Sequence, residues 1–163
     1  MKKIILLSDT HGALDERFLP HLEDANEIWH AGDIGDIEVL ENLEKTTKVR
    51  AVCGNIDNHI IRSATKEIIH FKCEEVNVLI THIGGYPGKY AKGIKEKIQK
   101  LRPKLFICGH SHILKVIFDK KFNLLHMNPG AAGNYGIHKV KTILKFKIDK
   151  ENITDLKVIE LKR

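Results

Sequence analysis

Ser8-Asp9-Thr10-His11-Gly12 is the stretch that decides the fold and the site of this chain. It directly follows a short apolar run, residues 3–7, which predicts a β-strand buried on both faces because no polar alternation is left for a solvent-facing side. In open α/β sheets, ligands bind at the carboxyl ends of the strands, where the loops diverge. Asp9 and His11 leave one strand end two residues apart, so the stretch predicts a cation-binding site.

Alternating strands and helices are expected to follow this first strand. Apolar runs predict further strands, and helical spacing of apolar residues predicts helices between them, the first interrupted at Pro20. The strands cover residues 3–7, 27–31 and 48–53, and the helices cover residues 14–25 and 37–44. This order predicts parallel strands joined by right-handed crossovers.

The remaining chain changes character, because most of its apolar runs follow one another without a helix between them. The expected strands are 67–72, 75–81, 104–108, 114–119, 123–127, 139–148 and 153–161. One amphipathic helix is expected over residues 90–101, closed by Pro103, and Asn128-Pro129-Gly130-Ala131 is expected to form a turn. We therefore expect a single α/β domain over residues 1–163. It is a two-sheet β-sandwich flanked by helices, parallel in its N-terminal part and antiparallel in its C-terminal part.

Composition restricts the class of protein. A chain of 163 residues with 42% hydrophobic and 29% charged residues is typical of one soluble globular domain. No run has the length of a signal peptide or membrane span, and Cys53, Cys73 and Cys108 lack a CxxC spacing, so we expect a cytoplasmic protein with reduced thiols and no membrane partner. The net charge of +6 suggests an anionic partner, but the basic residues are dispersed and aromatics are few, which disfavours nucleic acid as the main partner.

Seven polar residues stand just past the ends of expected strands and form the candidate site. They are Asp9, His11, Asp33, Asn55, His82, His110 and His112. Five of them, all but Asp9 and His112, have a glycine within two residues, which allows sharp turns and close approach of side chains. Imidazole, carboxylate and amide groups without a thiolate suit two divalent transition-metal ions better than calcium or magnesium. Taken singly, Asp33 can instead cap a helix, Asn55 can occupy a left-handed turn, and His82 can be a core histidine.

The order of these motifs resembles the calcineurin-like metallophosphoesterases. The motifs are Asp-x-His, Gly-Asp-x-x-Asp, Gly-Asn-x-Asp, a lone His and Gly-His-x-His, spread from Asp9 to His112. The short chain and Asn128-Pro129-Gly130 resemble the branch of small single-domain bacterial and archaeal phosphodiesterases. This resemblance implies a four-layer fold, with two sheets between outer helices, and hydrolysis of phosphate diesters as the activity.

The resemblance also implies roles for the individual residues. Asp9, His11 and His112 would hold one metal ion, and Asn55, His82 and His110 the other, with Asp33 bridging the two. A hydroxide between the ions would attack phosphorus in line, with Asp33, Asn55 and His110 as the catalytic residues. Manganese is the expected metal, with iron, nickel, zinc or cobalt as alternatives. Asp36 and Asp57 would orient ligand imidazoles or bound water.

One position departs from the family pattern. Many relatives carry a histidine after the Asn of Gly-Asn, where it is thought to protonate the leaving group, but this chain has Ile56. We therefore expect diesters or activated esters, including small nucleotide-derived diesters, rather than unactivated monoesters. His59 is a disfavoured substitute for the missing acid. In the glycine-rich stretch 83–90, Tyr86, Tyr90 and Lys89 either line the substrate entrance or lie on a surface loop.

Two other functional classes remain open at this point. A non-catalytic metal-binding scaffold, like trafficking subunits of the same fold, typically lacks the His of the first motif, whereas this chain keeps His11. A basic nucleic-acid-binding protein would show metal-independent, strongly salt-dependent binding. Exposed strand edges would permit a homodimer or tetramer. His21, His70, His126 and His138 match no motif and are expected on the surface or in the core.

Overall fold

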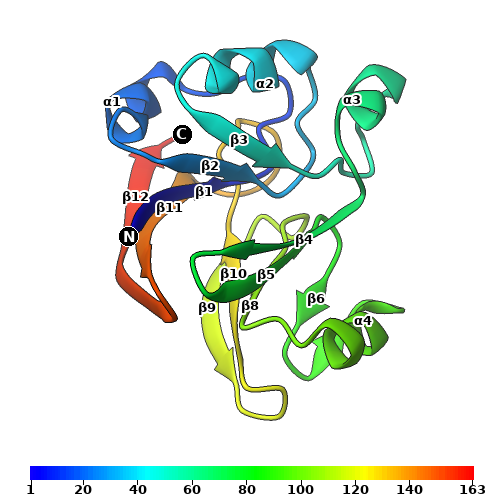
Figure 1. The fold of residues 1–163 in the computed structure, drawn as a ribbon. Coiled ribbons are helices and arrows are strands. Elements are labelled where there is room, and N and C mark those ends of the chain that lie inside the picture. Colours follow the sequence, from blue (N-terminus) through cyan, green and yellow to red (C-terminus); the bar gives the residue numbers. More distant parts are fainter.

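Two five-stranded sheets form the centre of the protein, and the computed structural model describes all residues from 1 to 163 (Figure 1). The first sheet has the order β12-β11-β1-β2-β3, with strands at Asn152–Lys162, Val140–Asp149, Lys2–Leu7, Glu27–His30 and Lys48–Ala51. Strands β1, β2 and β3 run parallel, as expected, whereas β11 is antiparallel to both β1 and β12. The chain thus returns to its first strand at the end.

The second sheet is also mixed, but its parallel strands lie in its middle. Its order is β4-β5-β8-β10-β9, with strands at Ile68–Cys73, Val76–Thr81, Leu105–Ile107, Leu124–Pro129 and Leu114–Asp119. Strands β5, β8 and β10 are parallel, and the edge strands β4 and β9 pair antiparallel with their neighbours. The expected two-sheet architecture is confirmed. The structure adds that the sheet formed by the C-terminal half is mixed rather than antiparallel throughout.

Helices cover the outer faces of the two sheets, which gives four layers. A short 3-10 helix, Glu16–Phe18, leads into α1, Leu19–Leu22, and α1 lies with α2, Ile37–Glu44, over the first sheet, whereas α4, Ile94–Leu101, lies beside the second (Figure 1). Asp36 caps α2 by accepting a hydrogen bond from the amide of Glu38. None of the helices is long and apolar enough to cross a membrane.

Strand β1 shows why its sequence is apolar without interruption. Ile4 and Leu6 point into the core between the sheets, where Trp29 packs edge-on against Phe146. Ile5 and its neighbour Leu7 point to the other side, into the core beneath α1 and α2. Both faces of the strand are therefore buried, and only its carboxyl end, at Ser8, leads to a polar region.

Several local predictions were wrong. The helix expected over 90–101 begins only at Ile94, because Gly93 adopts a left-handed φ of 81° and the preceding residues form the small hairpin of β6, Gly85–Tyr86, and β7, Lys89–Tyr90. Helix α3, His59–Ala64, was not predicted, since its single turn and a half carries no readable periodicity. Asn128 and Pro129 continue β10, and the chain turns one residue later, at Gly130.

Candidate metal centre

The site lies where the carboxyl ends of parallel strands from both sheets meet. Asp9 and His11 follow β1, Asp33 follows β2, and His82 follows β5. The fourth loop, after β8, carries both His110 and His112. Six of the seven predicted ligands form two clusters, in each of which the donor atoms lie within 4.8 Å of one another; these are Asp9, His11 and His112, and Asp33, His82 and His110.

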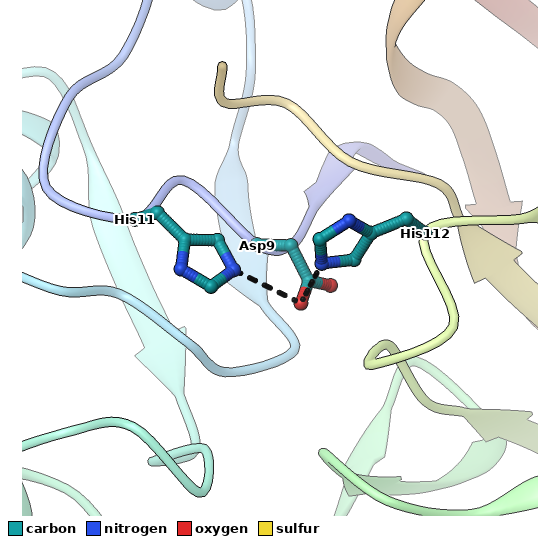
Figure 2. Close-up of side chains that lie close together, drawn as sticks. All are labelled: Asp9, His11 and His112. Atoms are coloured by element: carbon teal, nitrogen blue, oxygen red, sulfur yellow. Dashed lines mark ion pairs between the residues drawn. The ribbon is translucent and has the colours of Figure 1, made fainter. Parts of the chain in front are cut away.

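In the first cluster, two imidazoles approach the carboxylate of Asp9 (Figure 2). The Asp9 Oδ1 atom lies 3.1 Å from Nε2 of His112 and 3.8 Å from Nε2 of His11. The other oxygen, Oδ2, accepts hydrogen bonds from the Ser8 hydroxyl at 2.6 Å and from the amide of His110 at 3.1 Å. The protein thus holds one carboxylate oxygen and turns the other toward the histidines.

In the second cluster, the ring of His82 is fixed by the backbone of the other sheet. Its Nδ1 atom lies 2.8 Å from the carbonyl oxygen of Ala31, so Nδ1 carries the proton and donates it. Its Nε2 atom then faces Asp33 Oδ1 at 3.2 Å, and the ring of His110 stands edge-on at a centroid distance of 5.2 Å. A hydrogen bond at the far nitrogen is the usual way in which proteins prepare a histidine for a metal ion.

The carboxylate of Asp33 connects the two clusters. Its Oδ2 atom lies 3.6 Å from Nε2 of His11, in the first cluster, and its Oδ1 atom faces His82, in the second. The Oδ1 atom also accepts a hydrogen bond from the amide of Ile56 at 3.2 Å. One side chain therefore reaches both clusters, which is the position that a bridging ligand must occupy.

The donor atoms of this site fit a bound cation. Asp9 Oδ1, His11 Nε2 and His82 Nε2 are buried and have no hydrogen-bond partner within the protein. Buried polar atoms are normally paired, because leaving them without a partner costs free energy. These three atoms lie close to the carboxylate of Asp33, and no thiolate is present. The residues therefore suit divalent transition-metal ions.

Asn55 is the one predicted ligand outside the two clusters. It is exposed and lines a cavity of about 240 Å³ together with His82. Its loop is held by Arg62 of α3, whose guanidinium donates to the carbonyl oxygens of Gly54 at 2.8 Å and Asp57 at 3.0 Å. The structure thus places Asn55 beside the second cluster, and its role as a ligand stays a prediction.

The backbone around the site is unusual. Left-handed φ angles between 47° and 70° occur at five of the predicted ligands, namely Asp9, His11, Asp33, His110 and His112. Asp and His tolerate this region better than most residues, but such conformations cost free energy and concentrate at functional sites. Gly54 is required for a different reason, since a Cβ atom there would lie 2.0 Å from Asp33 Oδ1.

Ionisation of the carboxylates agrees with a cation site. Burial acts to raise the pKa of Asp9, but the nearby imidazoles of His11 and His112 outweigh it and hold the pKa well below its usual range. Burial and His82 oppose each other in the same way at Asp33, whose pKa is also lowered. Burial lowers the pKa of His82, whereas Asp33 and Asp9 raise it, with a net increase. Both carboxylates are therefore charged at neutral pH.

His30 supports the site and was not predicted from the sequence. His30, fully buried in β2, accepts a hydrogen bond from the amide of Gly32 at 3.1 Å and lies 3.0 Å from the hydroxyl of Thr10. Burial lowers the pKa of His30 to about 4, so the ring is neutral and ties the first two ligand loops together. No sequence signal marks it, because it lies inside an apolar strand.

The contacts to ligand imidazoles expected for Asp36 and Asp57 are not formed, and the alternative role toward bound water stays a prediction. Asp57 is buried and accepts hydrogen bonds from the backbone amides of Ile34, Gly35 and Gly54 at 2.7–3.1 Å. It thereby joins the loop after β2 to the loop after β3. Asp36 is exposed and only caps α2. Neither aspartate is hydrogen bonded to an imidazole.

A further loop, after β10, lies against the first cluster. The ring of Tyr135 is 4.8 Å from that of His11, and the ring of His138 is 5.4 Å from that of His112. The Nε2 atom of His138 lies 2.8 Å from the carbonyl oxygen of Gly133. Because a carbonyl can only accept, Nε2 carries the proton and donates it. His138, which matched no motif, is thus a neighbour of the site, whereas His59 is exposed at the start of α3.

Comparison with known proteins agrees with this site. A family model of the calcineurin-like phosphoesterase superfamily domain matches residues 1–151, and the chain belongs to this superfamily. A probable metallophosphoesterase of Methanocaldococcus jannaschii is 26% identical over 153 residues, covering 88% of this chain and 74% of the relative.

Solved structures show the same fold at lower identity. The Vps29 protein of Entamoeba histolytica, complexed with zinc, superposes with a TM-score of 0.77 at 17% identity and covers 98% of both chains. A novel archaeal phosphodiesterase superposes with a TM-score of 0.69 at 20% identity, over 98% of this chain and 99% of its own. Vps29 and an archaeal phosphodiesterase therefore share the fold of this chain.

Proposed function

We propose that this protein is a metal-dependent phosphodiesterase with a dinuclear site. The observation that carries the proposal is the position of Asp33, whose two carboxylate oxygens face histidines of two separate ligand clusters. A structural role alone does not explain why His11, His82 and Asp9 present buried atoms without partners at this point. The family membership of the chain supports the same activity.

Each residue has a defined part in this proposal. Asp9, His11 and His112 would hold one cation, and His82 and His110, with Asn55, the other. Asp33 would be shared between the two, and manganese is the proposed metal, with iron, nickel, zinc or cobalt as alternatives. When bound, a pair of such cations acidifies water and neutralises charge that develops on the phosphoryl oxygens.

The chain itself supplies orientation and charge balance. Ser8 and the amide of His110 fix the Asp9 carboxylate, and Ala31 fixes the proton of His82 at Nδ1, so the donor atoms are set before any ligand arrives. Asp9 and Asp33 provide only two negative charges, so a site with two dications keeps a net positive charge. Such a site attracts a phosphate diester and stabilises its equatorial oxygens.

The residue after Asn55 limits the choice of ester. Ile56 is exposed and has no proton to give, and no histidine stands in its place. Without a general acid, a leaving group must depart unprotonated, which costs a factor of about 10²–10⁴ for poor leaving groups. We therefore propose diesters and activated esters as substrates.

Hydrolysis of bis(p-nitrophenyl) phosphate tests this proposal. Protein stripped with a chelator should hydrolyse the diester only after Mn²⁺ is added, and Asp33→Asn should remove the activity while Asp36→Asn keeps it. Asp36 is the matched control because it is an exposed aspartate of the same loop. Turnover that survives chelation or the Asp33→Asn change would refute the proposal.

A non-catalytic interaction protein is the second candidate, and one observation favours it. Ile56, Ile83 and Ile113 each directly follow a predicted ligand and are 48%, 44% and 64% exposed. Exposed apolar side chains around one site are typical of a surface that a partner covers. This candidate predicts that the protein binds Mn²⁺ but hydrolyses neither bis(p-nitrophenyl) phosphate nor p-nitrophenyl phosphate.

A further inference from the structure

A second cavity, of about 160 Å³, lies next to the loop that carries His110 and His112. It is lined by Tyr86 of β6, Lys115 of β9, His126 and Asn128 of β10, and Ser111. Lys115 and Asn128 are directly opposed in the pairing of β9 with β10, so both side chains leave the same face of the second sheet. A cavity of this size exceeds the ~30 Å³ that one water molecule occupies, and it has room for a small oxyanion.

The wall of this cavity is connected to the metal centre. Ser111 stands between His110 and His112 in the chain, and the Asn128 amide donates to its hydroxyl oxygen at 3.1 Å. The same Asn128 amide group donates to the carbonyl oxygen of Gly109 at 2.9 Å. One residue that lines the cavity, Ser111, therefore stands between two predicted metal ligands in the chain.

The polar groups that line the cavity favour an anion. The Ser111 hydroxyl oxygen accepts hydrogen bonds from Asn128 and from the amide of Ile113 at 3.2 Å, which leaves its own proton free to be donated. The ammonium of Lys115 lies 4.5 Å from the centre of the Tyr86 ring and is not paired with a carboxylate. No Asp or Glu lines the cavity.

His126 is the second, independent indication of a ligand. Only 1% of this residue is exposed, and its Nδ1 atom has no hydrogen-bond partner. Burial lowers the pKa of His126 to about 4, with Lys115 adding to the effect, so the ring is neutral and can present an N–H group. A buried nitrogen without a partner costs free energy, and His126 is one of the residues that line the cavity.

The nearest acidic residue of the same strand face is already engaged. Asp119 and Lys115 belong to the same strand, β9, and an even number of positions separates them, so their side chains lie on the same face. Its carboxylate accepts hydrogen bonds from the hydroxyl of Tyr90 at 2.5 Å and from the amide of Lys121 at 2.9 Å. Lys115 is therefore the uncompensated charge at the cavity.

We propose that this cavity binds a second phosphate group of the substrate, held by Lys115, Ser111 and His126. The inference rests on the proposed phosphodiesterase function and narrows its substrate class to diesters that carry a further phosphate beside the scissile one. The ester would be hydrolysed at the metal centre, while the second phosphate remains in the adjacent cavity and positions the substrate.

Direct binding tests the cavity without any contribution from metal ions. Inorganic phosphate is titrated into the full chain in excess chelator at pH 7, and the NMR signals of the Asn128 side-chain amide and the Ser111 and Ile113 amides are followed. These signals should shift in the wild type, and Lys115→Met should weaken binding about tenfold or more, the usual effect of losing one charged hydrogen bond. Lys100→Met is the control, because Lys100 is an exposed lysine of α4 outside this cavity.

A pair of substrates then tests the role in catalysis. Thymidine 5′-(p-nitrophenyl phosphate) is compared with the same compound carrying a 3′-phosphate. The wild type should show a lower KM for the phosphorylated compound, Lys115→Met should remove this preference, and the exposed Lys100→Met, outside the cavity, should keep it. Ser111→Ala provides a second, smaller variant that does not alter the buried ring of His126.

The outcomes separate the two proposals. Phosphate binding that is absent in the wild type, or unchanged in Lys115→Met, overturns the inference even if the diester is hydrolysed. Phosphate binding that depends on Lys115 in a protein that hydrolyses no ester supports the cavity and refutes the proposed function.

Discussion

The Nδ1 atom of His82 lies 2.8 Å from the carbonyl oxygen of Ala31. His82 follows a strand of the second sheet and Ala31 follows a strand of the first, so this hydrogen bond crosses between the sheets at the site. Because the carbonyl can only accept, the proton is fixed at Nδ1 and the lone pair of Nε2 faces the site. One sheet therefore determines which nitrogen the other sheet offers to a cation.

Close approach at Gly54 predicts a loss of activity when a methyl group is added. In Gly54→Ala the new Cβ would lie 2.0 Å from Asp33 Oδ1 and 2.3 Å from its backbone nitrogen, so Asp33 must move. We expect hydrolysis of bis(p-nitrophenyl) phosphate to fall by about 10²-fold, as for other displacements near 1 Å. Gly88→Ala is the control: its φ of 85° makes this substitution strained in the backbone, but nothing lies within 4 Å of its Cβ position, so it lacks the contact with Asp33. Equal activity of the two variants would contradict the prediction.

Substitutions of Asp57 and Asp36 should differ strongly in their effect on the free energy of unfolding. Asp57→Ala leaves three backbone amides, two of them buried, without an acceptor, and we expect it to lower the free energy of unfolding by about 3 kcal/mol or more. Asp36→Ala removes only a helix cap and should cost about 1 kcal/mol. Urea denaturation of both variants measures the difference, and similar midpoints would refute the bracing role of Asp57.

The brace between Thr10 and His30 should affect metal affinity from a distance. Thr10→Val keeps the shape of the side chain but removes the hydroxyl that lies 3.0 Å from His30 Nε2 and donates to the carbonyl of Ile34 at 2.9 Å. Loss of such an outer contact typically weakens metal binding by about 10–100-fold. Calorimetric titration with Mn²⁺ measures this, with the exposed Thr154→Val as control. An unchanged affinity would mean that the brace serves folding alone.

Buried neutral histidines predict that stability falls between pH 6.5 and 4. The pKa values of His30 and His126 are lowered from 6.5 to about 4, so the unfolded chain binds protons in this range while the folded protein does not. Stability is therefore complete above pH 6.5 and decreases toward pH 4, by up to about 3 kcal/mol for each histidine. His82, with its raised pKa, contributes in the opposite direction.

A variant isolates this effect. His126→Leu should flatten the decrease in unfolding free energy between pH 6.5 and 4, measured by urea denaturation at several pH values, whereas the exposed His70→Leu should leave it unchanged. An equal slope in wild type and His126→Leu would show that His126 is protonated in the folded protein.

The sequence predicts the candidate metal ligands better than the buried residues that hold the ligand loops in place. Asp9, Asp33 and His82 could be placed because each follows an apolar run, and the carboxyl ends of parallel strands meet at one edge. His30 gave no signal, since a histidine inside such a run looks like any other buried residue. The link between Asp57 and three amides depends on loops that meet only in three dimensions.

Short elements were the other source of error. Strands β6 and β7 have two residues each and α3 has six, which is too few for any periodicity to be seen. The residue types of Asn128-Pro129 predict a turn, but both residues continue β10. A proline cannot donate an amide hydrogen bond within a sheet, and Pro129 is the last residue of its strand. Tyr135 and His138 reach the site from a loop that no motif marks.

The most direct test of the central claim is a parallel titration of bound Mn²⁺ and of bis(p-nitrophenyl) phosphate hydrolysis, starting from chelator-stripped protein. A dinuclear phosphodiesterase predicts that two Mn²⁺ ions bind per chain and that activity rises mainly with the second, with both steps weakened by Asp33→Asn. Binding of a single ion, or two bound ions without hydrolysis of the diester, would contradict the account.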